Sequence, residues 1–98
     1  MTIPFFDGHN DTLLRLADLP KGEQERAFIE GGAGGHIDLP RARAAGMAGG
    51  FFAIFPPPLK TAAPAPLVGP TPPPQLAVSD ALAATNAMAS VMFRLERA

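Results

Sequence analysis

The residues best suited to chemistry lie close to the N-terminus, where a histidine and an aspartate are separated by one residue. His9 and Asp11 follow the apolar segment Ile3–Phe6, which is typical of a short buried strand ended by a turn at Asp7-Gly8. In extended backbone, residues two apart point to the same side, so His9 and Asp11 direct a nitrogen and an oxygen at one point while Asn10 faces away. Zinc accepts both ligand types at roughly 2.0–2.2 Å. On spacing alone, the favoured interpretation makes His9 a turn residue and Asp11 the cap of the next helix, and a metal-binding pair is the alternative.

The same His-x-Asp spacing occurs again at His36 and Asp38, in a different context. This second pair follows the glycine-rich segment Gly31–Gly35, and Asp38 stands where a helix needs its N-cap. Because aspartate is among the preferred N-cap residues, we interpret Asp38 as a cap and His36 as a solvated loop side chain.

Length and composition exclude several other functions. The chain has 98 residues and a formal net charge of -1, which gives no electrostatic basis for binding nucleic acid or an anionic membrane. It contains no Cys, so disulfides within the chain, thiolate metal sites and cysteine nucleophiles are excluded. The sequence also lacks a phosphate-binding glycine loop and a serine nucleophile elbow. We expect no membrane span and, because signal-peptide features are missing at the start, a cytoplasmic location.

Further segments have the patterns of regular structure. Leucines at helical spacing predict a short helix over 11–19. An N-cap, an early proline and a final glycine predict a two-turn helix over 38–46. An apolar run without polar alternation predicts a strand within 47–55 that is buried on both faces. The polar stretch 23–35, in contrast, is interpreted as a surface connection.

The C-terminal half contains a proline-rich segment and one long helix. Nine of the twelve prolines fall within 56–74, which predicts an extended loop of polyproline type. A final helix is predicted over 79–97. The order of strands and helices before them predicts an α/β fold with parallel strands, in a single domain. The apolar stripe of the final helix, at spacings of three and four, consists of Leu82, Thr85, Met88, Ala89, Met92 and Leu95, broadened by Val91 and Phe93.

Three blocks of residues carry a resemblance to a known family. They are Asp7-Gly8-His9-Asn10-Asp11, Asp38-Leu39-Pro40-Arg41 and Gly46–Phe55. Over residues 3–55 the sequence resembles the N-terminal part of the membrane (renal) dipeptidases, a family of zinc metallopeptidases. The resemblance implies a (β/α)8 metallohydrolase barrel of the TIM type, with a two-zinc site at the C-terminal ends of its strands. It also implies that His9 and Asp11 are the first two ligands of one zinc ion, while the bridging glutamate and two later histidines of the family match no position here.

A (β/α)8 barrel typically needs about 250 residues, so this chain supplies about two strand–helix units. We therefore interpret residues 1–98 as the N-terminal piece of one incomplete dipeptidase barrel domain, with exposed strand edges that favour self-association. The complete enzyme would hydrolyse the peptide bond of dipeptides through a metal-activated water. With two metal ligands, the chain alone is expected to be inactive. The alternative is a non-catalytic barrel remnant that binds a protein partner through its proline-rich segment and its C-terminal helix.

Overall fold

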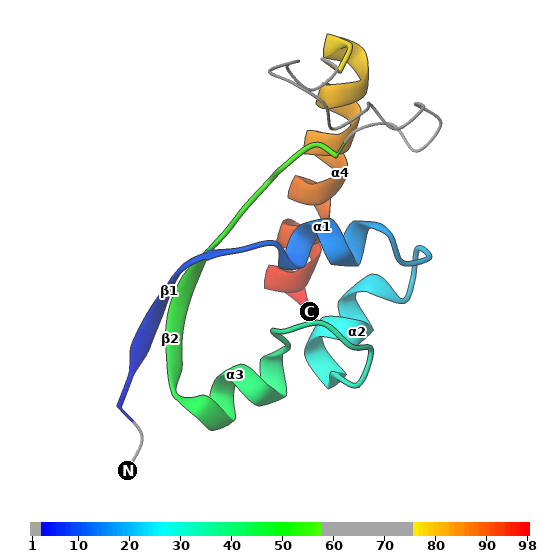
Figure 1. The fold of residues 1–98 in the computed structure, drawn as a ribbon. Coiled ribbons are helices and arrows are strands. Elements are labelled where there is room, and N and C mark those ends of the chain that lie inside the picture. Colours follow the sequence, from blue (N-terminus) through cyan, green and yellow to red (C-terminus); the bar gives the residue numbers. More distant parts are fainter. Residues whose placement is uncertain (1–2, 58–75) are drawn as a thin grey trace, which may run out of the picture.

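The computed structural model describes residues 3–57 and 76–98, which form a mixed α/β fold with one pair of parallel strands. The two strands, β1 and β2, lie side by side, and α1 extends from the end of β1 (Figure 1). This arrangement confirms the α/β class and the parallel pairing that the sequence predicts. The elements are β1 (Phe5–Asn10), α1 (Thr12–Ala17), α2 (Gln24–Glu30), α3 (Leu39–Ala45), β2 (Met47–Phe52) and α4 (Val78–Arg97).

The predicted end of β1 is wrong, because the strand continues through Asp7-Gly8 and ends at Asn10. Asp7 pairs with Gly50 and Asn10 with Phe52, so three steps along β1 match two steps along β2. The extra residue makes a β-bulge, which bends a strand and re-aims its side chains. His9 consequently lies inside β1 and not beyond its end.

α3 forms where local signals in the sequence predict it. Asp38 is its N-cap, and the Asp38 carboxylate accepts a hydrogen bond from the backbone N–H of Arg41 at 3.0 Å. Pro40 stands in the first turn, where a helix needs no N–H from it. Gly46 ends the helix in the left-handed conformation, with φ of 87°. The interpretation of Asp38 as a helix cap is confirmed, and α3 leads directly into β2.

The small core lies between α1 and α4. Leu13 and Leu16 of α1 pack with Met88 and Val91 of α4, and all four side chains are buried. Residues three apart share one face of a helix, so each helix contributes a matched pair. This packing fixes the start of α1 and therefore the position of the residues that connect β1 to α1.

α2 is a helix where the sequence predicts a surface connection, so that prediction is wrong. The guanidinium of Arg94 in α4 donates hydrogen bonds to Gln24 Oε1 at 2.6 Å and to Glu25. Phe28 packs edge to face against Phe52, with ring centroids 6.1 Å apart. The residues that stabilise α2 are thus distant in sequence, which a local pattern does not show.

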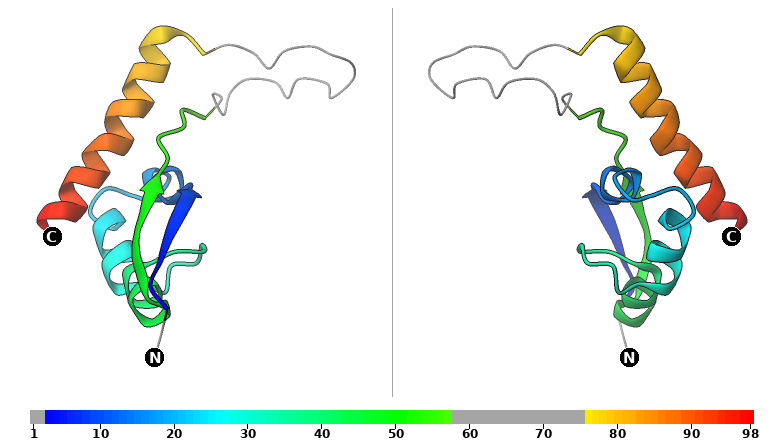
Figure 2. Two further views of the ribbon diagram at one scale, coloured as in Figure 1. Left: turned by 90° about the vertical axis from the view of Figure 1, so that its left-hand side faces the viewer. Right: turned by 90° about the vertical axis from the view of Figure 1, so that its right-hand side faces the viewer.

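Three predictions about burial are also wrong. The segment Ile3–Phe6 is predicted to be a buried strand, but Ile3 is 84%, Phe5 45% and Phe6 57% exposed. Phe51 of β2 is 67% exposed, because in the described part of the chain the sheet has two strands and no layer over this ring. Phe93 is 60% exposed and Leu82 is 57% exposed, although the sequence places both on the buried stripe of α4. The first turns of α4 stand clear of the other described elements (Figure 2), whereas Ala84 already packs against the core. Self-association through such apolar surface stays a prediction.

The C-terminal half agrees in part with the sequence prediction. α4 begins one residue before the helix predicted over 79–97 and ends at Arg97. From residue 58 onward, the predicted proline-rich loop over 56–74 lies outside the described residues. Within 3–57 and 76–98, no helix combines the length and the apolar character that crossing a membrane requires.

The loop between α2 and α3 gives a prediction about stability. Gly35 has φ of 76°, and a Cβ added there would overlap the Arg15 side chain; Gly32 has φ of 82°, but an added Cβ would meet nothing within 4 Å. Alanine at either position strains the backbone by about 1–2 kcal/mol. Gly35→Ala also displaces the Arg15 side chain from its hydrogen bond to the carbonyl oxygen of Ile37, which costs about 0.5–1.5 kcal/mol more. We expect Gly35→Ala to lower the urea midpoint clearly more than Gly32→Ala does. Equal midpoints would show that the Arg15 contact is not tight.

Candidate metal centre

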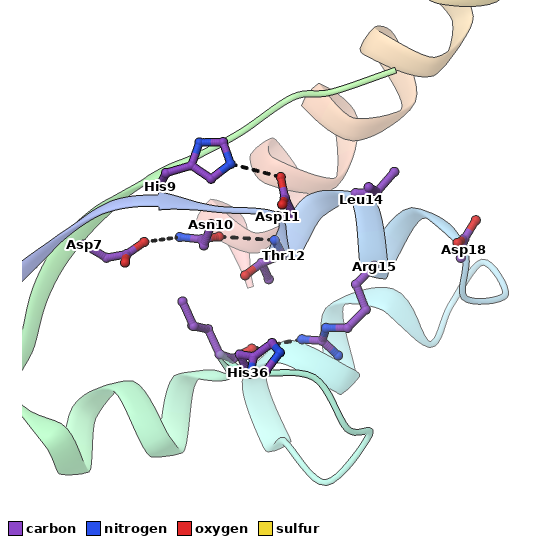
Figure 3. A pocket seen from close by; sticks show the side chains of 10 residues that line it. Asp7, His9, Asn10, Asp11, Thr12, Leu14, Arg15, Asp18 and His36 are labelled. Atoms are coloured by element: carbon purple, nitrogen blue, oxygen red, sulfur yellow. Dashed lines mark hydrogen bonds and ion pairs between the residues drawn. The ribbon is translucent and has the colours of Figure 1, made fainter. Parts of the chain in front are cut away.

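His9 and Asp11 meet at the C-terminal end of β1, where their side chains turn towards each other (Figure 3). His9 Nε2 lies 3.2 Å from Asp11 Oδ1, and the side chains are 68% and 58% exposed. Two ligand atoms on a tetrahedral zinc ion stand roughly 3.4 Å apart, given bond lengths of about 2.0–2.2 Å. The observed separation therefore fits two ligands of one ion, and imidazole nitrogen and carboxylate oxygen are ligand types that zinc binds.

Asp11 does not cap α1, so this part of the interpretation favoured on spacing alone is wrong. Asp11 occupies the N-cap position, but its side chain makes no capping hydrogen bond. Asn10 Oδ1 accepts the backbone N–H of Thr12 in its place, at 3.2 Å. The carboxylate of Asp11 is left available to face His9.

A cavity of about 660 Å³ opens beside this pair. Its walls combine carboxylates, an arginine and aliphatic side chains, and its volume lies within the range of roughly 300–1,000 Å³ that is common for small-molecule sites. The cavity therefore has the size and the mixed polarity that suit a small polar ligand. The lining residues are Asp7, His9, Asn10, Asp11, Thr12, Leu14, Arg15, Asp18, His36 and Ile37.

Two arginines fix the loop that forms the opposite wall of the cavity. Arg15 donates from Nη2 to the carbonyl oxygen of Ile37 at 2.9 Å, and Arg41 donates from Nη2 to that of Gly35 at 2.9 Å. His36 lies between these two anchored carbonyls and is exposed, as the sequence predicts for a solvated loop side chain.

The described residues bring two candidate metal ligands together, His9 and Asp11. Within 3–57 and 76–98, no group of three or more His, Cys, Asp or Glu side chains is arranged to hold one. Residues 58–75 contain none of these residue types. Catalytic zinc sites typically use three protein ligands. His9 and Asp11 therefore fit part of such a site.

Asp38 makes the stability of the fold depend on pH. The hydrogen bond from the Arg41 backbone N–H lowers the pKa of the Asp38 carboxyl below its ordinary value of 3.8; burial opposes this shift, and the Arg41 side chain at 2.6 Å adds to it. A lowered pKa in the folded state stabilises the fold above the ordinary value, and this stabilisation is lost as pH falls through the folded pKa. We expect the urea concentration at the unfolding midpoint to decrease as the pH falls below about 4. The decrease should be less steep for Asp38→Asn than for the unchanged chain. Parallel declines of the two proteins would contradict this role.

Comparisons with known proteins connect this geometry to the metallopeptidases. Over 99% of its length, the chain is similar to a solved metallopeptidase, with a TM-score of 0.79 and 40% sequence identity. That protein is dipeptidase AC. The chain is also 52% identical, over 56 residues or 57% of its length, to an uncharacterised protein of Acinetobacter calcoaceticus encoded in the 3′ region of PQQ-III. It spans 28% of the solved dipeptidase and 18% of the Acinetobacter protein. No family model matches the sequence.

Sequence reasoning missed the contributions of Asn10 and Arg15 to this site. A signal for Asn10 exists, because asparagine two residues before a helical N–H is a common side-chain acceptor for it. No local signal exists for Arg15, whose partner Ile37 is 22 residues away.

Proposed function

We propose that this chain forms the N-terminal part of a zinc-dependent dipeptidase of the membrane dipeptidase family, in which His9 and Asp11 bind one metal ion. The observation that carries the proposal is the 3.2 Å separation of His9 Nε2 and Asp11 Oδ1 at the end of a parallel strand. The similarity to dipeptidase AC over nearly the whole chain supports it. In (β/α)8 barrels, chemistry takes place at the C-terminal ends of the strands, which is where this pair stands.

The residues of this chain hold the ligands and shape the space beside them. When bound, zinc would polarise the scissile carbonyl group and lower the pKa of a water molecule towards about 7. His9 would offer an imidazole nitrogen to the ion, and Asp11 a carboxylate oxygen. Leu14 and Arg15 give the adjoining cavity an apolar and a cationic wall, which suits a small peptide as substrate.

In this proposal hydrolysis requires further metal ligands, because no third His, Cys, Asp or Glu joins the pair within residues 3–57 and 76–98. We therefore expect the chain alone to be inactive. The partner-binding alternative depends on the proline-rich segment over 56–74 and on α4. From residue 58 onward that segment lies outside the described residues, and Met88 and Val91 of α4 are buried against α1. The alternative stays a prediction.

Exchange of segments between two proteins tests the proposal. In the hybrid, residues 1–98 of this chain replace the part of dipeptidase AC that they match, and hydrolysis of a dipeptide substrate of dipeptidase AC is measured with added zinc. We expect zinc-dependent hydrolysis. A hybrid that folds, as judged by circular dichroism and thermal unfolding, but hydrolyses no dipeptide would contradict the proposal.

A further inference from the structure

We infer that Asn10 and Asp7 are positioning residues that hold His9 and Asp11 in their metal-binding arrangement. This inference rests on the function proposed above for the pair. Asn10 donates from Nδ2 to Asp7 Oδ2 at 3.0 Å, and its Oδ1 accepts the backbone N–H of Thr12 at 3.2 Å. We call this chain of hydrogen bonds, from Asp7 through Asn10 to Thr12, the Asn10 clasp; Figure 3 shows it as a set of contacts separate from the His9–Asp11 pair.

The first bond of the Asn10 clasp spans the bulge in β1. In a regular strand, Asp7, His9 and Asp11 would all point to one side and Asn10 to the other. The bulge between Asp7 and Asn10 breaks this alternation. The side chains of Asp7 and Asn10 are half-buried and hydrogen-bonded to each other, while His9 is exposed. Asp7 is thereby kept apart from the metal-binding pair, and the backbone on both sides of His9 is fixed.

The second bond of the clasp determines what Asp11 does. The first N–H groups of a helix need acceptors, and an aspartate at the N-cap position ordinarily supplies one. Here Asn10 supplies the acceptor for Thr12, which is a buried residue, so water does not readily replace it. Asp11 makes no capping bond and lies 3.2 Å from His9 Nε2 instead. Without the Asn10 amide, we expect the Asp11 carboxylate to turn towards the helix and away from His9.

Nuclear Overhauser contacts in the full 98-residue chain test the clasp without any metal. A contact between the His9 ring protons and the Asp11 β-protons is expected in the unchanged chain and absent in Asn10→Ala. The Asn10→Asp variant should also lose this contact, because the new carboxylate repels that of Asp7. Combining Asn10→Asp with Asp7→Asn reverses the donor and acceptor of the first bond and keeps an oxygen for Thr12, so the contact should return.

A zinc titration, followed through the ring resonances of His9, tests the same clasp through ligand binding. Groups that orient metal ligands typically change metal affinity by about 10–100-fold, and we expect a loss of that size in Asn10→Ala with recovery in the double exchange. Gly8→Ala is the matched control inside the bulge, because an added Cβ meets nothing within 4 Å. Asp38→Asn controls for a loss of stability remote from the pair. Both controls should keep the zinc affinity of the unchanged chain.

The two measurements separate failure of this inference from failure of the proposed function. An unchanged His9–Asp11 contact in Asn10→Ala overturns the positioning role, whether or not zinc binds. If zinc binds the unchanged chain without shifting the ring resonances of His9, the proposed metal pair is overturned. The positioning role of Asn10 is then still decided by the His9–Asp11 contact measured without metal. If Asn10→Ala does not fold, Asp7→Ala, which removes the acceptor at the other end of the clasp, is expected to weaken the same contact.

Discussion

Replacement of Leu16 by alanine is expected to unfold most of the chain. Leu16 is completely buried. In the described part of the chain, the other buried apolar side chains are Leu13, Met88 and Val91, and all four form one core. Truncation of a buried leucine costs about 2–5 kcal/mol, through lost apolar transfer and the cavity left behind. Such a loss is comparable with the whole stability of a marginal domain, about 5 kcal/mol. Urea unfolding followed by circular dichroism measures it.

Leu82→Ala is the matched control for this substitution. It makes the same chemical change, but Leu82 lies in the first turns of α4 and is 57% exposed. Surface substitutions of this kind usually stay within about 0.5 kcal/mol. If Leu16→Ala and Leu82→Ala unfold at the same urea concentration, the contact between α1 and α4 is not the core of this protein.

Removal of the His9 imidazole is expected to have the largest effect on catalysis. In the hybrid with dipeptidase AC, His9→Ala deletes one of two ligands that this chain supplies to the proposed metal ion. We expect the rate of dipeptide hydrolysis at saturating substrate to fall by at least about 10³-fold. Removal of one preorganised group that stabilises the transition state typically has an effect of this size. Measured without zinc, the melting temperature of the hybrid should change little, because the His9 side chain is 68% exposed in this chain.

His36→Ala in the same hybrid distinguishes the two histidines. His36 lines the same cavity as His9, but it belongs to the loop before α3 and lies outside the His9–Asp11 pair. Its removal is expected to leave the rate of hydrolysis within a few-fold. Equal losses for His9→Ala and His36→Ala would contradict the assignment of His9 and Asp11 as the metal ligands from this chain.

The fold was predictable where neighbouring residues determine it. α3 has its cap, its proline and its final glycine within nine residues, and the buried face of α1 follows from the spacing of Leu13 and Leu16. α2 was not predictable in this way, because Arg94, which binds its first turn, is 69 and 70 residues away in sequence. Burial of the Phe51 ring was predicted from an apolar run, but a run does not reveal whether a covering layer is present.

The candidate site was predictable in its residues but not in its construction. The His-x-Asp spacing and the resemblance to dipeptidases point to His9 and Asp11, which the fold places 3.2 Å apart. The sequence suggests a turn at Asp7-Gly8, whereas a bulged strand carries the pair. That difference matters physically, since the bulge turns Asp7 towards Asn10, and Asn10 accepts the backbone N–H of Thr12 in place of the Asp11 carboxylate.

The position of zinc in crystals of the hybrid tests the central claim most directly. Anomalous diffraction at the zinc absorption edge locates the ion without reference to activity. We predict a peak within about 2.0–2.2 Å of both His9 Nε2 and Asp11 Oδ1. Zinc bound elsewhere in the hybrid, with no peak between these two atoms, would contradict the account.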